Sequence, residues 1–157
     1  MIRLTLLKIL VLMVFTVSLP VKAGKIDITQ ALLAQPEVVQ GISSICHDIC
    51  KGNNRKSWLT WAELDILPGT YSILNAHIRL RNRHIWKIFG KKRTAYSDHS
   101  TLKIKAHINN ETCKASVHHK DIHFTNDLYK IGWWLARRLD NIFDFLPRIK
   151  RQLPICN

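Results

Sequence analysis

Hydrophobic residues recur with a helical period near both ends of the chain. Residues 36–51 place an apolar side chain at every third or fourth position, and Pro36 suits the first turn of a helix. Residues 126–146 repeat this pattern, with Asn126 as the expected N-cap and Pro147 as the stop. The expected apolar stripes are Val38, Ile42, Ile45 and Ile49 in the first helix, and Leu128, Ile131, Leu135, Leu139, Ile142 and Leu146 in the second.

Between these helices the pattern changes to a period of two. Apolar and polar residues alternate over residues 74–81, 102–108 and 113–118, which is typical of half-buried strands in an antiparallel sheet. Residues 57–66 are a weaker strand candidate, and residues 109–112 are expected to form a hairpin loop. This order predicts an α+β fold, with an antiparallel sheet of about four strands covered by an N-terminal helix and a C-terminal amphipathic helix. Cystatin-like and lipid-cradling folds both fit, so the topology stays open.

The first 23 residues are typical of a signal peptide. Arg3 and Lys8 precede a charge-free, mainly apolar run from Ile9 to Leu19, and Ala23 supplies the small residue at the expected cleavage site. The run is shorter than the ~20 residues of a membrane-spanning helix. We therefore expect an exported protein, periplasmic or secreted, that folds as a single disulfide-bonded domain over residues 24–157.

The chain is strongly basic, with a formal net charge of +13. The expected signal peptide holds three cations and no acid, so the remaining domain keeps +10. This excess favours an anionic partner such as membrane lipid, an envelope polymer or an acidic protein. Export argues against nucleic acid as the partner.

All four cysteines lie in the expected mature domain, and an exported protein is expected to pair them in two disulfides. Cys46 and Cys50 lie one turn apart on the first expected helix, where a bond between them would strain helical geometry. The 109–112 hairpin would direct Cys113 toward that helix. We therefore expect one of Cys46 and Cys50 to pair with Cys113 and the other with Cys156.

Two groups of residues invite an enzymatic interpretation. The string His47-Asp48-Ile49-Cys50 resembles the catalytic-helix motif of secreted phospholipases A2, but Ser43 and Ser44 replace its paired cysteines and no glycine-rich calcium loop lies upstream. His77, His107 and His118 fall on polar faces of expected strands, where imidazoles can bind a metal or transfer protons. No metal-ligand spacing accompanies them. We therefore expect no catalytic residue, metal or cofactor.

The expected hairpin concentrates cations on one face of the sheet, because it places His107 opposite Lys114, Lys103 opposite His118 and Lys105 opposite Ser116. Residues 83–93 are expected to form a loop that interleaves cations with aromatic side chains, which suits a lipid headgroup boundary. Trp133 projects from the polar side of the second helix. The candidate binding residues are Arg79, Arg81, Trp86, Lys87, Lys91, Lys92, Arg93, Lys103, Lys105, His107, Lys114, His118 and Trp133.

These observations predict an exported, non-enzymatic binding protein whose basic sheet face and aromatic loop engage an anionic partner, membrane lipid or cell-envelope polymer first. The alternatives are an inhibitor or immunity-type protein that blocks an acidic enzyme or toxin, and a small histidine-dependent hydrolase. Asn110-Glu111-Thr112 also matches an N-glycosylation acceptor, which matters only in a eukaryotic source.

Overall fold

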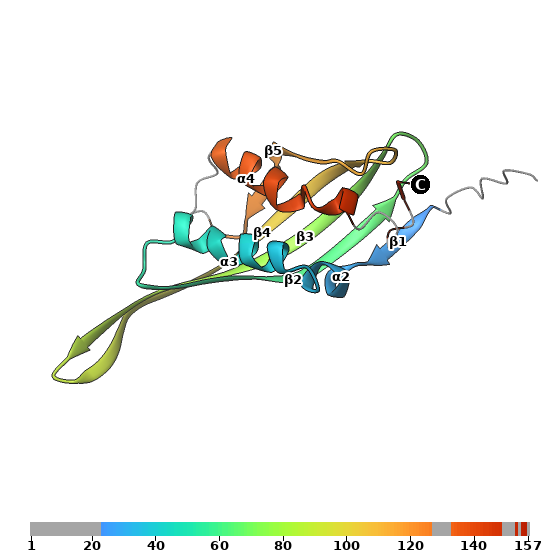
Figure 1. Ribbon diagram of the computed structural model, residues 1–157. Helices are drawn as coiled ribbons and strands as arrows, with labels where there is room; N and C mark the ends of the chain where they lie inside the picture. The colour runs from blue at the N-terminus through green and yellow to red at the C-terminus, as the bar shows by residue number, and fades with distance from the viewer. Residues whose placement is uncertain (1–22, 127–132, 149–152, 154, 157) are drawn as a thin grey trace, which may run out of the picture.

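Long alternating segments form the sheet that organises the fold (Figure 1). The computed structural model describes residues 23–126, 133–148, 153, 155 and 156. Five antiparallel strands lie side by side in chain order, so the predicted α+β class is confirmed with five strands rather than about four. The elements are β1 (Gly24–Asp27), α2 (Thr29–Leu33), α3 (Pro36–Ile49), β2 (Asn54–Ile66), β3 (Tyr71–Ile88), β4 (Lys91–Asn109), β5 (Ala115–Phe124) and α4 (Trp133–Phe143).

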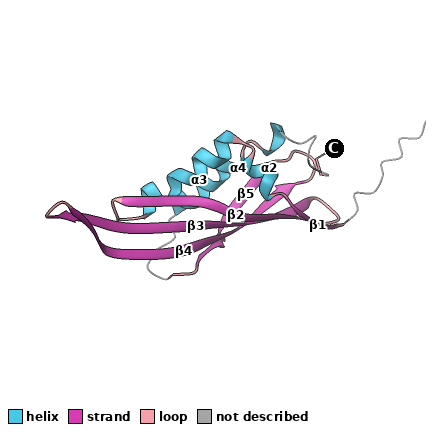
Figure 2. Ribbon diagram, turned by 90° about the horizontal axis from the view of Figure 1, so that it is seen from below, coloured by secondary structure: helices cyan, strands magenta, loops and turns pink. Residues whose placement is uncertain are grey.

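The three helices of the described residues lie on one side of the sheet (Figure 2). Helix α3 contacts β2 and β3, and α4 contacts β5. Every second residue of β3 from Ser72 to Asn82 is buried beneath this layer, whereas the residues between them are half-buried or exposed. The apolar face of α3 and the residues Leu135, Leu139 and Phe143 of α4 complete the core. Polar contacts fix the helices, since Ser57 Oγ accepts a hydrogen bond from the backbone N of Cys46 and Asp140 accepts one from that of Val117.

A β-bulge explains why β2 is only weakly visible in the sequence. Buried positions run through Ser57 and Leu59, and then continue through Ala62, Leu64 and Ile66. The register shifts between Leu59 and Trp61, so the buried set changes from odd to even positions. A single period of two therefore does not describe the whole strand.

The expected register of the β4–β5 hairpin is wrong, by two residues near the turn and by five residues beyond the shift between Ile104 and Ala106. His107 pairs with Ser116 rather than with Lys114, and Lys103 pairs with His123 rather than with His118. The turn is longer than expected. The backbone N–H of Asn109 donates a hydrogen bond to Lys114 O, and the Asn109 side chain accepts hydrogen bonds from the backbone N–H groups of Glu111 and Thr112. Cys113 within this turn has a positive φ of 59°, a conformation that strand alternation does not anticipate.

Residues 83–93 do not form the expected loop, because β3 and β4 continue as a paired hairpin to its tip. Ile88 pairs with Lys91, and the two residues between them, Phe89 and Gly90, both have positive φ. Two-residue turns of this kind match the natural twist of a hairpin. Residues 83–97, hereafter the arm, extend well beyond the helices (Figure 1).

Both disulfides differ from the expected pairing. Cys46 bonds Cys50, with 4.9 Å between the Cα atoms, and Cys113 bonds Cys156. The first bond fits because α3 ends at Ile49, and Cys50 already has an extended backbone (φ −90°, ψ 139°). The second ties the C-terminal segment to the β4–β5 turn. Two disulfides agree with the oxidising compartment expected from the cysteine count.

Several expectations fall outside the described residues. Residues 1–22 of the expected signal peptide, which was expected to end at Ala23, lie outside the described part, as do Leu128 and Ile131 of the expected C-terminal stripe. Within the described part, that helix buries the expected Leu135, Leu139 and Ile142. Among the described helices, none has the length and hydrophobicity needed to cross a membrane.

Candidate functional site

The side of the sheet opposite the helices carries four of the cations that the sequence analysis selected, namely Arg79, Arg81, Lys103 and Lys105. We call it the open face, because its residues are half-buried or exposed rather than covered. Cross-strand pairing sets its rows, with Lys56, Arg81 and His99 nearest the arm, followed by Trp58, Arg79 and Thr101. Beyond them lie Trp61, His77, Lys103 and His123, then Glu63, Asn75 and Lys105, and finally Asp65, Ile73 and His107.

Positive and negative charges are not mixed evenly over the open face. The acids Glu63 and Asp65 lie toward the end remote from the arm, and Glu63 Oε1 is 3.1 Å from Lys25 Nζ. Asp121 of β5 lies 3.3 Å from His107 Nε2. In the described chain, the ammonium groups of Lys103 and Lys105 form neither an ion pair nor a hydrogen bond. The positive potential of the middle rows is therefore uncompensated by direct contacts.

A hollow of about 270 Å³ lies in these middle rows. Its residues are Asn75, His77, Lys103, Ile104, Lys105, Asp121 and His123. The β4–β5 register shifts between Ile104 and Ala106, so that Lys105 alone lies opposite the segment from His118 to Asp121. Such a bulge interrupts the hydrogen-bonded ladder and separates the two strands locally. The hollow thus occupies a position where β4 and β5 are not closely paired.

His77 forms the wall of the hollow toward β2. Its ring centroid lies 4.7 Å from that of Trp61, with the planes tilted by 49°. Burial in this setting, and secondarily the positive charge of Lys103, lower the pKa of His77 below its ordinary value of 6.5. A neutral imidazole beside an ammonium group can donate or accept a hydrogen bond without adding further repulsion.

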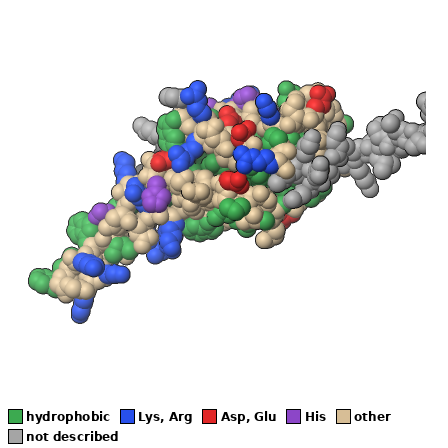
Figure 3. Space-filling model, in the orientation of Figure 1, with side chains coloured by type: hydrophobic (Ala, Val, Ile, Leu, Met, Phe, Trp, Pro, Cys, Tyr) green, Lys and Arg blue, Asp and Glu red, His purple; other side chains and the backbone are tan. Residues whose placement is uncertain are grey.

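The arm forms a second surface with a different composition. Phe89 at its tip is fully exposed and Trp86 is 53% exposed, while Ile88 and Tyr96 are exposed beside them. The edge-to-face contact of His84 with Trp86 and its stacking with Tyr96 place these aromatic rings on one side of the arm. Residues 83–97 include five cations and no acid, and Figure 3 displays blue and green side chains toward the tip.

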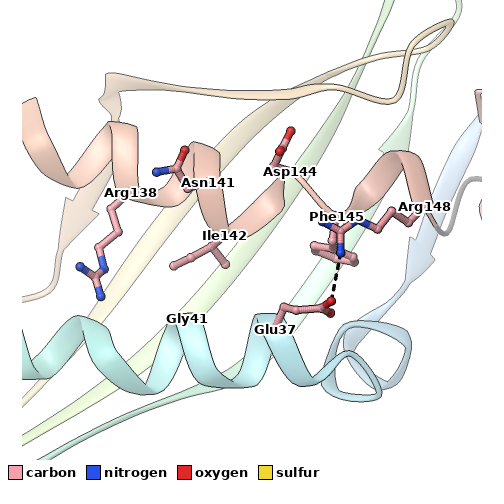
Figure 4. A pocket seen from close by; sticks show the side chains of 8 residues that line it. All are labelled: Glu37, Gly41, Arg138, Asn141, Ile142, Asp144, Phe145 and Arg148. Carbon is pink, nitrogen blue, oxygen red and sulfur yellow. Dashed lines mark hydrogen bonds and ion pairs between the residues drawn. The ribbon is translucent and has the colours of Figure 1, made fainter.

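A groove of about 340 Å³ separates α3 from α4, and three of the charged residues that line it, Glu37, Arg138 and Arg148, form ion pairs (Figure 4). Arg148 Nη1 is 3.0 Å from Glu37 Oε1, and Arg138 contacts Asp48 and the hydroxyl of Ser44. A Cβ at Gly41 would lie 2.8 Å from Ile142, so the two helices approach closely there. These contacts join the helices and leave little charge to bind a ligand.

The structure distributes the predicted binding residues over the two surfaces. Arg79, Lys103 and Lys105 are exposed on the open face, where Arg81 is half-buried, and His107 bonds Asp121 and lies 5.3 Å from the ring of His118. The arm carries Trp86, Lys87, Lys91, Lys92 and Arg93. Lys114 is exposed in the β4–β5 turn. The side chain of Trp133 lies outside the described part of the chain.

Sequence reasoning missed several residues of the open face, namely Trp58, Trp61, Asn75, Asp121 and His123. Alternation alone assigns Asn75 and His77 to the same side of one strand, and this signal was present. Trp61 follows the β2 bulge, Asp121 lies within the β5 bulge and His123 follows it, so a constant period of two misplaces all three residues. Tracking Ala62, Leu64 and Ile66 separately from Ser57 would have assigned Trp61 correctly.

The enzymatic interpretations gain no support from the geometry. Asp48 contacts Arg138, and His47 beside it is exposed on α3. Within the described residues, no group of three or more histidine, cysteine, aspartate or glutamate side chains has a geometry suited to a metal ion. His107 and His118 are neighbours, but His77 lies in another row beside Lys103.

Comparison with known protein families, characterised proteins and solved structures found no match to this chain.

Proposed function

We propose that this protein is an exported, non-enzymatic binding protein that attaches to anionic membrane surfaces through the arm. The observation that carries the proposal is the composition of the arm tip, where a fully exposed Phe89 and the exposed Trp86 and Ile88 lie among Lys87, Lys91, Lys92 and Arg93. Aromatic and aliphatic side chains flanked by cations suit the boundary between acyl chains and anionic headgroups.

The exposed aromatic side chains are costly unless they meet a partner. A large apolar side chain gains roughly 1.5–3 kcal/mol on full burial, of which the fully exposed Phe89 obtains almost nothing and the 53% exposed Trp86 only a part. The paired backbone of the arm keeps its ladder hydrogen bonds internal up to Ile88 and Lys91, so that only the tip needs to enter the headgroup region. Each cation near an anionic leaflet adds about 1 kcal/mol of attraction.

Charge also favours lipid over a neutral partner. The expected mature domain keeps a formal charge of +10, and the arm holds no acid among residues 83–97. An acidic protein that this chain inhibits, or an acidic envelope polymer, would complement the same positive charge. Neither alternative explains why a fully exposed side chain at the tip of the arm, Phe89, is a phenylalanine with no polar group.

Vesicle flotation tests the proposal. The protein is expected to bind phosphatidylcholine vesicles that contain about 30 mol% phosphatidylglycerol, to bind pure phosphatidylcholine much more weakly, and to lose affinity as salt rises. Phe89→Ser should weaken binding by roughly tenfold or more without a change of charge.

Trp86→Ser and Tyr71→Ser provide a matched pair, since both aromatic side chains are 53% exposed. Trp86 belongs to the arm, whereas Tyr71 pairs with Asn109 at the opposite end of β3. Only Trp86→Ser is expected to reduce vesicle binding. Equal binding of all three variants and the native protein, or binding indifferent to both salt and anionic lipid, contradicts the membrane proposal.

A further inference from the structure

We propose that the hollow on the open face binds a phosphate group carried by a small hydroxylated ligand, as in a phosphomonoester of glycerol or a sugar. The residues that would contact it are Asn75, His77, Lys103, Lys105, Asp121 and His123, which the pairing of β3, β4 and β5 brings together. This site is separate from the arm and does not depend on membrane attachment.

The charges of the hollow favour an anion. Lys103 and Lys105 project from alternate positions of β4 onto the same face, and in the described chain neither ammonium group has an ion-pair partner. Two such groups beside an amide and two imidazoles supply donors of the kind that bind phosphate oxygens. Phosphate therefore fits better than a neutral or cationic ligand.

Asp121 sets a second requirement on the ligand. Its carboxylate is the acid within the hollow, and one oxygen already lies 3.3 Å from His107 Nε2. A carboxylate repels a bare anion but accepts a hydrogen bond from a hydroxyl group. A phosphate ester with a neighbouring hydroxyl would meet both Asp121 and the lysines, whereas inorganic phosphate would meet only the lysines.

The size of the hollow limits the ligand. About 270 Å³ lies just below the ~300–1,000 Å³ that is usual for small-molecule sites. It accommodates a phosphate with a few carbon atoms, and not an acyl chain. The shared chemistry has two sources, a soluble phosphomonoester or the exposed headgroup of a lipid phosphomonoester, and the experiment below separates them.

Isothermal titration calorimetry with glycerol 3-phosphate is the direct test. We expect saturable binding with one ligand per protein, weaker binding of inorganic phosphate, and at least a tenfold loss of affinity in Lys103→Gln. Lys92→Gln removes the same charge from the arm, where Lys92 pairs with Lys87, and should change affinity less than about twofold. A pH titration of the histidine side chains followed by NMR provides a second measurement, in which bound glycerol 3-phosphate should raise the pKa of His77.

Equal losses of glycerol 3-phosphate affinity in Lys103→Gln and Lys92→Gln would overturn the inference. A heat signal that does not saturate with ligand concentration would also overturn it, because both results indicate general charge attraction rather than a specific site. Phe89→Ser keeps full affinity for glycerol 3-phosphate, so failure of the membrane proposal leaves this test intact. Vesicles with about 20 mol% phosphatidic acid then identify the source. Displacement of glycerol 3-phosphate from Phe89→Ser by these vesicles points to the lipid headgroup, and retention points to the soluble ester.

Discussion

The two faces of the sheet are built from alternate residues of the same strands, yet they differ in almost every property. Beneath the helices, β3 presents Leu74, Ala76, Ile78 and Leu80, all fully buried. On the open face it presents Asn75, His77, Arg79 and Arg81, which are half-buried or exposed. Because neighbouring residues of one strand point in opposite directions, stability and binding are carried by separate residue sets.

The helix layer differs from the open face in how its charges are used. In the groove between α3 and α4, Arg138 and Arg148 each contact a carboxylate from the neighbouring helix. In the hollow of the open face, Lys103 and Lys105 have no such contact within the described chain. Paired charges join elements of the protein, whereas uncompensated charges that converge on a hollow are available to a ligand.

The largest expected effect comes from a substitution beneath the helices. Ile78→Ala should lower the free energy of unfolding by about 2–5 kcal/mol, because Ile78 is fully buried on the helix-covered face of the sheet. The adjacent Arg79→Ala on the open face should change it by less than about 0.5 kcal/mol. Urea denaturation followed by circular dichroism measures both. Equal destabilisation by the two variants would break the distinction between the faces.

A smaller effect is expected from two neighbouring residues of β2, where loss of the smaller side chain should cost more stability than loss of the larger one. Ser57 is buried, and its hydroxyl accepts a hydrogen bond from Cys46 N and donates one to Ile42 O at 2.6 Å. Ser57→Ala leaves these groups unsatisfied and should cost about 1–3 kcal/mol. The next residue, Trp58, is exposed on the open face, and Trp58→Ala should cost less than about 1 kcal/mol. A larger loss in Trp58→Ala, again by urea denaturation, would contradict this assignment.

Period-two alternation predicts much of this division, and it fails where the backbone departs from regular geometry. It places Lys103, Lys105 and His107 on one side of β4 because that strand is regular there. It misplaces Trp61 and His123, because each residue follows a bulge. It also predicts the wrong β4–β5 register, because the Asn109 side chain accepts hydrogen bonds within the turn and makes the turn longer than expected. Bulges and turns depend on tertiary contacts that the local pattern does not contain.

The disulfides and the arm show the same limit. The pairing of Cys46 with Cys50 depends on where α3 ends, and helix ends are uncertain by a residue or two from sequence alone. The arm lacks the Asn-Gly or Asp-Gly turn that usually reveals a hairpin, since Phe89-Gly90 occupies its tip. Its cations and aromatic residues were nevertheless found, because composition does not depend on the backbone conformation.

The smallest expected effect is a pH dependence that His77 contributes from the open face. Its pKa is lowered in the folded protein, first by burial and then by Lys103, whereas in the unfolded chain it returns to about 6.5. Trp61, Glu63, Lys105, Asp121 and His123 surround it from β2, β4 and β5.

As pH falls through 6.5, the unfolded chain binds a proton at His77 before the folded protein does. The stability contributed by His77 is therefore complete above this pH and declines until the lowered folded pKa is reached. Urea denaturation without phosphate, at about pH 7.5 and 5.5, should give a smaller loss of stability on acidification in His77→Gln than in the native protein. An identical loss of stability in His77→Gln and in the native protein would mean that His77 has the same pKa in the folded protein and in the unfolded chain. The imidazole of His77 would then be exposed to solvent in the folded protein rather than partly buried beside Trp61 and Lys103.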